Sequence, residues 1–570
     1  MKKKVHVALF SVCGQLLVAE TNIYIMNNKR EILIVLICFI LMIPDDLFGT
    51  GLKVEIEKPV IPVLVKKEIN PVLKISLLRN DDKPYIVTGI RVDLSGTTQI
   101  SDVESIAVYA TDEQGMIDDR RQLSKISSVK EKLCFNDKIE VDTDTISFWI
   151  AVKLKDAVDL DHRIQIKCDE IRTTSGSIKK PMESGNRLRI GVAVRQKGQD
   201  GVVSSRIPGL TTSLDGTLLA IFDARYDSSR DLQGDMDIAL HRSVDKGKTW
   251  EPMQVILDMG EWGGLPEKYN GVSDACILVD ETTKDIYVAG LWMYGALDDD
   301  GKWIDGLTEN SDYWIHQWRQ KGSQPGLGLK ETCQFLITKS TDDGLTWSFP
   351  DDITPKTKRP EWWLFAPAPG HGITLDDGTL VFPTQGRDEN GLPFSNITYS
   401  RDHGRNWITS NPAYSDVTEN NVVQLNDGTI MLNMRDNRNR GKKEPNGRRI
   451  CVTSDLGENW IEHPTSRKAL VEPTCMASLH KHKYTVNGEE KTILLFANPN
   501  DYKTRDKLTL KVSFDDGLTW PEEHWILFDE YRSSGYSSIT SVDKDTIGIL
   551  YESSQADMAY IQIKLSELLR

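Results

Sequence analysis

Short apolar runs bounded by turn residues recur along the last two thirds of the chain. Several of them open on an Asp-Gly-Thr turn, and the clearest are GTLLAIFDA (216–224), KDIYVAGLW (284–292), DGTLVFPTQ (377–385), DGTIMLNMR (427–435), KTILLFANP (491–499) and DTIGILYES (545–553). Runs of this length with turn signals beside them predict buried β-strands rather than helices. Because they return at a fairly regular distance, they indicate an all-β repeat architecture.

An eight-residue motif lies at a constant phase between these runs. It reads STDDGLTW from Ser340, and near copies start at Ser243, Ser400, Thr453 and Ser513. The aspartates at its third place follow one another after 97, 60, 53 and 60 residues. A period of about 50 to 60 residues is typical of propeller blades, each a four-stranded antiparallel sheet. We predict a six-bladed β-propeller over 186–570, with a blade that lacks the motif and a long insertion (293–322) inside the 97-residue gap.

The motif contains hydroxyl and carboxylate side chains, which are common catalytic groups, yet it predicts a turn rather than a catalytic site. Its Ser or Thr and its Asp can hydrogen-bond the backbone amides of a tight turn, while Gly supplies a positive φ. Its Trp can pack between neighbouring sheets. Five copies around a propeller lie at different azimuths and cannot converge on one substrate, so the catalytic residues must lie elsewhere.

The segment 51–185 lacks the motif. It carries alternating stretches such as PVLKISLL, ESIAVYAT and TISFWIAVKL, with polar turns between them. This pattern predicts an accessory β-sandwich, followed by a linker over 175–186. Two roles stay open for it at this point, carbohydrate binding and a purely structural role.

The first 50 residues are predicted to be a leader. Twelve apolar residues (32–43) follow the charged stretch NNKRE, a run short for a membrane span and suited to a signal-peptide core. Met26 stands just before this stretch, so translation could start there. The alternative is a retained membrane anchor, and in both cases we expect an exported protein, periplasmic, on the cell surface or extracellular.

Composition and charge narrow the function classes. The formal net charge is −15, which argues against a nucleic-acid partner and requires any anion site to be a local cluster of Arg. The eight cysteines form no CxxC pair, and no His spacing suggests zinc, so we predict no metal and no cofactor. One or two disulfides are compatible with an exporting pathway, and we expect a monomer.

The stretch SSRIPGL (204–210) gives the first functional indication. An Arg-Ile-Pro signature ahead of the first repeat motif resembles the bacterial exo-α-sialidase family of glycoside hydrolases. The resemblance covers about 186–570. It implies a six-bladed propeller that hydrolyses terminal sialic acid from glycoproteins, gangliosides or oligosaccharides, with retention through a glycosyl-tyrosine intermediate.

Sialic acid carries a carboxylate on its anomeric carbon, so an enzyme acting there needs a fixed cationic clamp. Arg suits this task because its planar fork binds a carboxylate through two parallel hydrogen bonds. The family uses three Arg, and the matching positions are Arg206, Arg435 and Arg505. Glu552 resembles the family residue that supports the first of them.

A carboxylate nucleophile would be repelled by the substrate's own carboxylate, by about 4 kcal/mol at roughly 4 Å and an effective dielectric near 20. A neutral Tyr avoids this repulsion, and sialidases are the known Tyr exception among glycosidases. The family pattern places that nucleophile at Tyr536 and its base at Glu419. Tyr has an ordinary pKa of about 10 and therefore needs such a base.

Further assignments rest on the same resemblance. The acid/base is expected at Asp231, with Asp227 as the second choice, and its pKa would have to rise when substrate covers it. Arg225 and Asp274 are expected at the C4 side of the sugar. Gln385 is a candidate for the pocket of the N-acetyl and glycerol groups; for Trp292 and Met293, ordinary blade packing is the favoured alternative.

Two other functions remain open from the sequence. One is transfer of sialic acid to another sugar, or intramolecular transfer that gives an anhydro product, because both use the same core residues. The other is a non-catalytic sialoglycan-binding propeller, which would have no reason to keep Tyr536, Glu419 and Asp231 together.

Overall fold

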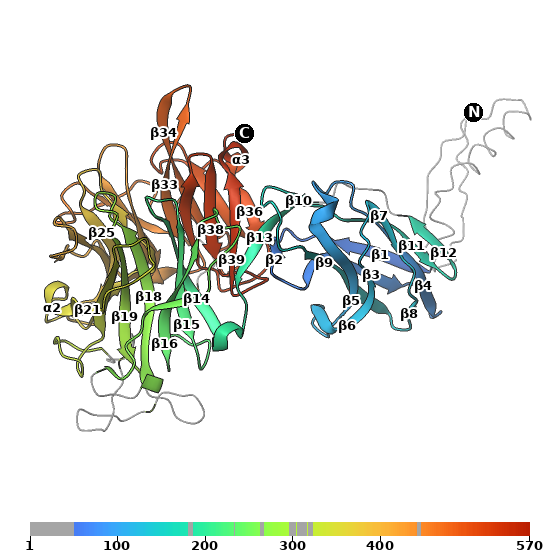
Figure 1. Cartoon of the computed structure of the whole chain (residues 1–570), viewed down its shortest axis with the longest axis horizontal. Helices are drawn as coiled ribbons and strands as arrows, with labels where there is room; N and C mark the ends of the chain where they lie inside the picture. The colour runs from blue at the N-terminus through green and yellow to red at the C-terminus, as the bar shows by residue number, and fades with distance from the viewer. Residues whose placement is uncertain are drawn as a thin grey trace, which may run out of the picture.

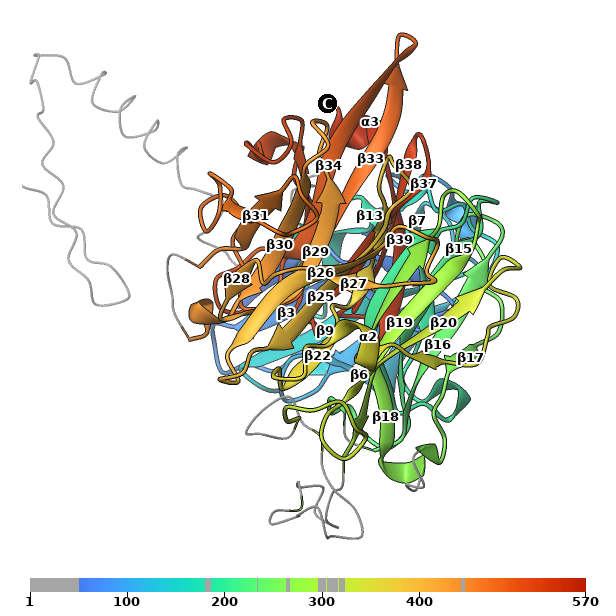
Figure 2. The same ribbon diagram turned by 90° about the vertical axis from the view of Figure 1, so that its left-hand side faces the viewer.

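The computed structural model describes residues 51–179, 186–232, 234–262, 267–295, 304, 316, 323–441 and 446–570. The predicted leader and most of the predicted insertion lie outside the described residues. The chain is all-β, as predicted, with two short helices in its described part, α2 (Thr354–Thr357) and α3 (Leu565–Leu568). Figure 1 shows a smaller sandwich beside a larger body of sheets, and Figure 2 shows the molecule turned by 90° so that the larger body faces the viewer.

The N-terminal segment folds as a sandwich of two antiparallel sheets. One has the order β1 (Leu52–Glu57), β3 (Asn70–Arg79), β9 (Thr145–Leu154), β5 (Val103–Thr111) and β6 (Ile117–Ile126). The other has the order β12 (Gly176–Lys179), β11 (Lys167–Thr173), β4 (Tyr85–Asp93) and β7 (Lys132–Phe135), with β8 (Ile139–Val141) beside β4. Their facing aliphatic side chains share one core. Since β12 occupies 176–179, the linker expected from residue 175 begins later.

Five antiparallel four-stranded units follow in chain order. The first consists of β14 (Ser204–Thr212), β15 (Leu218–Arg225), β16 (Met236–Ser243) and β17 (Gln254–Leu257), and the second of β18 (Asn270–Val279), β19 (Ile286–Tyr294), β20 (Gln334–Ser340) and β21 (Asp351–Asp352). In the third, the first strand is divided into β22 (Leu364–Pro367) and β24 (Ile373–Thr374), both paired with β25 (Leu380–Arg387), and β26 (Pro393–Ser400), β27 (Ile408–Thr409) and β28 (Tyr414–Ser415) follow. Between β22 and β24, β23 (Gly370–His371) pairs in parallel with β18 of the second unit. The fourth consists of β29 (Val417–Gln424), β30 (Ile430–Asp436), β31 (Arg449–Thr453) and β32 (Ile461–Glu462), and the fifth of β33 (Ser478–Val486), β34 (Glu489–Pro499), β35 (Leu508–Ser513) and β36 (Ile526–Asp529). All six apolar runs of the sequence are second strands of blades.

The sixth unit joins the two ends of the propeller. It consists of β37 (Ser537–Asp543), β38 (Thr546–Tyr551), β39 (Met558–Lys564) and β13 (Leu188–Arg195), with β13 antiparallel to β39. Inner strands of successive blades contact one another, and β37 contacts β14 of the first blade. The Leu210 amide also donates to Ser538 Oγ at 2.9 Å across that contact. This is the arrangement of a six-bladed propeller.

The expected position of the blade without the motif is wrong. The 97-residue gap holds one ordinary blade, β18 to β21, lengthened by the segment between β19 and β20, and its motif starts at Ser340. The blade without the motif is the sixth. In the other five blades the motif forms the turn from the third strand to the fourth. In the sixth, those strands are β39 and β13, which belong to opposite ends of the chain, so no such turn exists.

The motif is a turn, as predicted. In the copy at Ser340, the hydroxyl donates to Asp342 Oδ1 at 2.8 Å and accepts from the Gly344 amide at 2.9 Å. Asp342 also accepts from the amide and hydroxyl of Thr346. The glycine has a φ of 79°, and the other four copies repeat this geometry. All five turns lie away from the cavity described below.

The sandwich and the propeller are joined by backbone pairing. Strand β2 (Val63–Val65) runs parallel to β13, and β10 (Arg163–Ile164) pairs with the same strand. Glu567 of α3 bridges the two parts, because it forms salt bridges with Arg163 at 3.1 Å and with Arg189 at 2.6 Å. Strand and salt bridge together fix the sandwich against the last blade.

Two predictions concern the cysteines and the membrane. The six cysteines of the described chain, from Cys134 to Cys475, are all free, so the disulfides that the sequence allowed are absent there. Within the same residues, every helix is too short to cross a membrane.

Candidate active site

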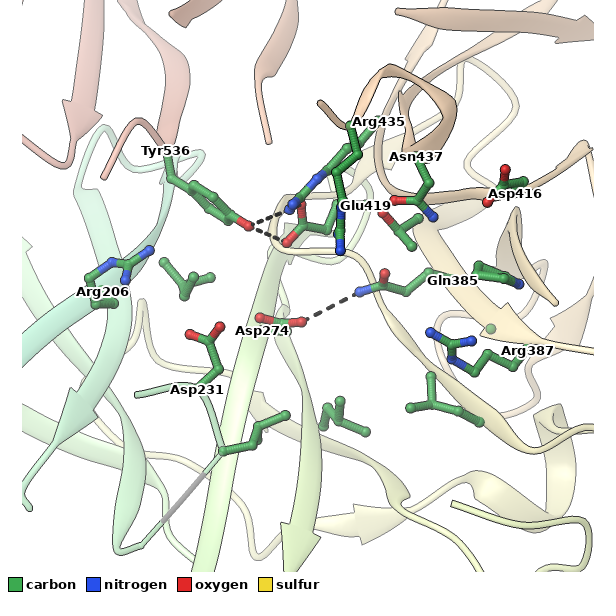
Figure 3. A pocket seen from close by; sticks show the side chains of 18 of the residues that line it. Arg206, Asp231, Asp274, Gln385, Arg387, Asp416, Glu419, Arg435, Asn437 and Tyr536 are labelled. Carbon is green, nitrogen blue, oxygen red and sulfur yellow. Dashed lines mark hydrogen bonds and ion pairs between the residues drawn. The ribbon is translucent and has the colours of Figure 1, made fainter. Parts of the chain in front are cut away.

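A cavity of 670 Å³ opens where several blades present different side chains. The predicted residues that line it come from separate elements: Arg206 from β14, Asp231 from the loop after β15, Asp274 from β18, Gln385 from β25, Glu419 from β29, Arg435 from β30, Arg505 from the segment between β34 and β35, and Tyr536 from the residue before β37. Figure 3 shows most of these side chains pointing into one space. Residues that are up to 330 positions apart therefore meet, which a repeated motif could not achieve.

Tyr536 and Glu419 form the centre of the site. The phenol donates a hydrogen bond to Glu419 Oε1, and both side chains are buried, with 6% and 7% of their surfaces exposed. Arg435 Nη1 donates to Glu419 Oε2 at 2.5 Å and to the phenolic oxygen at 3.0 Å. A carboxylate and a guanidinium thus hold one phenolic oxygen between them, as the dashed lines of Figure 3 show.

The phenol is neutral in this environment. Burial and the charge of Glu419 raise the pKa of Tyr536 well above its ordinary value, although Arg435 and Arg505 act in the opposite direction. A neutral phenol avoids repulsion of an anionic substrate. The hydrogen bond to Glu419 supplies the path by which the proton can leave when the oxygen attacks.

Three guanidinium groups face the same side of the cavity. Arg206 pairs with Glu552 at 2.5 Å, and Arg435 pairs with Glu419. Arg505 donates to the Ser534 carbonyl at 2.8 Å and lies 5.6 Å above the Tyr536 ring, and it has no salt bridge within the described chain. It is therefore the cation of this group whose charge is least neutralised.

Glu552 lies behind the clamp rather than in the cavity. Its side chain is 2% exposed, and its two oxygens accept from the backbone amides of Ile207 and Tyr536, each at 3.0 Å. It also accepts from Arg206 Nε. One carboxylate therefore ties the first blade to the sixth and fixes the position of both Arg206 and Tyr536.

Asp231 occupies the loop expected for an acid/base group. Its side chain is 56% exposed, and Arg225 Nη1 donates to it at 2.7 Å. Burial of the carboxyl raises its pKa, but the charge and hydrogen bond of Arg225, with smaller effects of Arg206 and Arg505, outweigh burial and lower the pKa below its ordinary value. The surrounding cations thus stabilise the carboxylate, and the rise in pKa expected when substrate covers Asp231 stays a prediction.

Arg225 differs from the expectation of a sugar contact. Its side chain is 1% exposed, it does not line the cavity, and its second Nη donates to Asp223 at 2.9 Å. Asp223 is fully buried and also accepts from Ser273 Oγ at 2.6 Å. Arg225 therefore fixes the position of the Asp231 side chain, and Asp223 in turn fixes the position of Arg225.

Asp274 and Gln385 come from neighbouring blades and point toward each other in the cavity (Figure 3). Asp274 has a φ of 56°, and Gln385 Nε2 donates to Asp274 Oδ2 at 3.5 Å and to the Pro367 carbonyl at 3.3 Å. Burial, and then the charges of Glu419 and Asp223, raise the pKa of Asp274 well above its ordinary value. Its carboxyl is therefore protonated over a wider pH range than a free Asp and can donate a hydrogen bond.

The structure also separates the weaker candidates from the site. Asp227 accepts from the Asp235 amide at 3.4 Å and does not line the cavity. Trp292 and Met293 are buried in the blade cores, in agreement with the packing alternative. Among the described residues, no group of three His, Cys, Asp or Glu is arranged to hold a metal ion.

Several lining residues were missed by sequence reasoning. Arg387 lies two positions after Gln385 on β25, so strand alternation places both on one face and could have identified it. Others come from loops, whose course no periodic pattern predicts: Asp416, Asn437 and Arg440. They add polar groups to the cavity wall.

Comparisons with known proteins identify the family of the chain. A family model described as the BNR repeat-like domain matches residues 207–548, and one described as the N-terminal domain of BNR-repeat neuraminidase matches 52–141. The chain is 36% identical to the sialidase of Bacteroides fragilis (strain YCH46), over 95% of this chain and 100% of that protein. It belongs to the BNR-repeat sialidases.

Two further relatives place the chain within this family. The sialidase of Micromonospora viridifaciens is 31% identical over 62% of this chain and 50% of that protein. The solved structure of Hadza microbial sialidase Hz136 is 33% identical and superposes with a TM-score of 0.80, over 90% of this chain and 99% of that one. The chain is therefore a glycoside hydrolase that acts on sialylated substrates by hydrolysis of sialic acid.

Proposed function

We propose that the protein is an exo-α-sialidase that retains configuration through a glycosyl-tyrosine intermediate. The observation that carries the proposal is the buried hydrogen bond from Tyr536 to Glu419, with Arg435 on the same phenolic oxygen. A phenol held in this way is a neutral nucleophile with its base in place. Membership of the family supports hydrolysis in general, and this pair supports the specific path.

The clamp binds the substrate by its carboxylate. Arg505 lacks a carboxylate partner in the described chain, while Arg206 and Arg435 keep unused donors toward the cavity. A ligand carboxylate therefore completes the charge balance of the three guanidinium groups. The active-site cavity, of 670 Å³, suits one terminal sugar, which favours an exo-acting enzyme.

In the first step, Tyr536 Oη forms a bond to the anomeric carbon and its proton passes to Glu419. The bond from that carbon to the aglycone oxygen breaks, and Asp231 donates its proton to the departing oxygen. In the second step, Asp231 takes a proton from a water molecule that attacks the anomeric carbon. The tyrosine oxygen leaves and recovers its proton from Glu419, so two inversions give net retention.

Substrate binding also prepares the acid. Arg206 and Arg505 are among the cations that lower the pKa of Asp231. A substrate carboxylate placed between them offsets their field, and the sugar covers the exposed half of the Asp231 side chain. Both changes raise the pKa of Asp231, so the acid becomes protonated when a leaving group is present.

The first experiment follows hydrolysis of an aryl α-sialoside by proton NMR. We expect the α-anomer of free sialic acid to form before it mutarotates to the β-anomer. Initial release of the β-anomer would contradict retention. Formation of a sialyl-acceptor product or of an anhydro sugar would instead support transfer or intramolecular transfer.

The second experiment identifies the nucleophile. A 3-fluoro sialosyl fluoride slows both steps, and mass spectrometry of a peptide digest should then show the added sugar on Tyr536. Tyr536→Phe should lower kcat by at least about 1,000-fold, since the nucleophile is lost, while sialic acid binding measured by calorimetry persists because the clamp is intact. Full activity of this variant, or a label on another residue, would refute the assignment.

The sialylated glycans of other cells lie outside the cytoplasm, so export fits this activity. We propose that the protein is exported, on the basis of the apolar run at 32–43 in the sequence. Fractionation of the producing cells and sequencing of the N-terminus of the exported protein test this directly. Recovery of all activity in the cytoplasm would contradict it.

A further inference from the structure

Arg448 and Glu472 form a buried ion pair outside the active-site cavity. Arg448 is the residue before β31, and Glu472 lies in the segment between β32 and β33. Both side chains are 0% exposed, and Arg448 Nη1 donates to Glu472 Oε2 at 2.7 Å. Because desolvation of the two charges offsets their attraction, such a pair adds little to the free energy of folding. Its other contacts indicate a second role.

The strand that carries Arg435 is only partly held by backbone pairing. β30 runs to Asp436, but its pairing with β31 ends at Met434. On the other side, the register between β30 and β29 shifts between Val417 and Asn420, the partners of Asp436 and Met434. Regular pairing is therefore interrupted on both sides of Arg435, and its backbone needs other contacts to fix it.

The buried pair supplies these contacts. Glu472 Oε1 accepts from the Asp436 amide at 2.8 Å, immediately after Arg435. Arg448 Nη2 donates to the Asn433 carbonyl at 3.2 Å, and its Nε donates to the Asn433 side chain at 2.7 Å. The backbone is thus held by one ion pair both before and after Arg435.

The same guanidinium also contacts the segment beside the nucleophile. Arg448 Nη1 donates to the Cys475 carbonyl at 2.8 Å. Cys475 belongs to the same buried apolar cluster as Tyr536, and its thiol donates to the Ser534 carbonyl at 3.8 Å. The ion pair therefore connects the strand of Arg435 with the residues that pack against Tyr536.

We propose that Arg448 and Glu472 are positioning residues, which hold the Arg435 guanidinium against Glu419 and the oxygen of Tyr536. Neither residue lines the cavity, so both act through Arg435. A small displacement of Arg435 would weaken its grip on the substrate carboxylate and its bond of 3.0 Å to the phenolic oxygen. This inference rests on the proposed function, because it assumes that Arg435 acts on both groups.

The test is a double-mutant cycle between Arg448→Lys and Arg435→Lys, with kcat/KM measured on an aryl α-sialoside. Arg448→Lys keeps the positive charge but loses most of the bonds to Asn433 and Cys475. Alone, it should lower kcat/KM by about 10- to 100-fold, because a small misplacement of a reacting group has effects of this size. In the Arg435→Lys background it should change kcat/KM by less than about twofold, since the group through which it acts is already lost.

Two further variants separate this role from a loss of stability. Glu472→Gln keeps the size of the side chain and an acceptor for the Asp436 amide, so it supplies the same cycle if Arg448→Lys fails to fold. Arg242→Lys is the matched control, because Arg242 is also buried and its Nε donates to the Asp343 carbonyl in a repeat-motif turn. This variant should leave kcat/KM unchanged.

Two results would overturn the proposal. Losses by the same factor with and without Arg435→Lys would mean that the pair does not act through Arg435. Unchanged kcat/KM in folded Arg448→Lys and Glu472→Gln would mean that the pair serves only the fold. If Arg435→Lys itself keeps full activity, the role of Arg435 in the proposed function fails instead, so the two failures are distinguishable.

Discussion

At the scale of single residues, the site depends on buried charges that neutralise one another in pairs. Glu552 holds Arg206, Glu419 holds Arg435, and Arg225 is shared between Asp223 and Asp231. Because each buried charge has a partner, removal of one member leaves the other unpaired at a substantial cost. The side chains that never touch substrate should therefore still affect the reaction.

Asp223 provides the sharpest test of this idea. It takes one hydrogen bond from Arg225, and burial raises its own pKa to about 6 although Arg225 and Ser273 act in the opposite direction. In Asp223→Asn, the full charge of Arg225 would act on Asp231 and lower the pKa of Asp231 further. A smaller fraction of the enzyme then carries the protonated Asp231 that a poor leaving group needs, so kcat/KM on sialyl-lactose should fall about tenfold relative to an activated aryl sialoside.

Two variants serve as controls for that measurement. Asp231→Asn should show the same dependence on the leaving group to a larger extent. Tyr536→Phe should lower kcat/KM by the same factor for both substrates. An equal loss on both substrates in Asp223→Asn would mean that Asp223 only stabilises the fold.

At the scale of elements, the repeated turn determines how neighbouring blades pack. Gly247 has a φ of 83°, and a Cβ placed on it would lie 2.1 Å from the ring of Tyr560 in β39. Gly428, in the first hairpin of the fourth blade, has a similar φ of 87° but no heavy atom within 4 Å of such a Cβ. Substitutions at the two glycines therefore distinguish the cost of backbone strain from the cost of a packing clash.

We predict that Gly428→Ala destabilises the protein by roughly 1 kcal/mol, since an alanine there only adopts a left-handed backbone. Gly247→Ala should lose about 1 to 3 kcal/mol more, because the ring of Tyr560 must also move. Urea unfolding with fluorescence detection measures both. Equal losses would show that the turn does not press against the last blade.

At the scale of the whole molecule, one carboxylate connects the two structural parts. Burial opposes the ionisation of Glu567, but Arg189 and Arg163 outweigh it and lower the pKa of Glu567 to about 2 from an ordinary 4.5. Its stabilising effect is complete above the unfolded pKa and disappears as pH falls from about 4.5 toward 2. The shift corresponds to about 3 kcal/mol at neutral pH.

Glu567→Gln should therefore lower the free energy of unfolding at pH 7 by an amount of this order. The difference between variant and wild type should shrink below pH 4.5 and be nearly absent at pH 2. Urea titrations at pH 7 and pH 3 check the sign. A difference that grows on acidification would contradict the linkage.

The blades and the residues that meet in the cavity could be predicted because both correspond to recognisable motifs in short stretches of the sequence. Turn motifs and apolar runs locate the strands, and single Arg, Glu and Tyr residues then stand at family positions, as Tyr536 does before β37. Asp223 leaves no such mark, because its role depends on Arg225 and on Ser273 of another strand, a combination that no local pattern reveals. The blade without the motif was misplaced for the same reason, since β13 and β39 are far apart in the sequence.

The pairing of β13 with β39 also has a consequence during synthesis of the chain. β13 leaves the ribosome early, and β2, which precedes it, can cover one of its edges at once. Its other edge has no native partner until β39 emerges near the end of translation. Through this interval the nascent ring stays open, and an unpaired strand edge is a template for association with other chains. Removal of β39 should therefore leave an aggregating product rather than a smaller, soluble propeller.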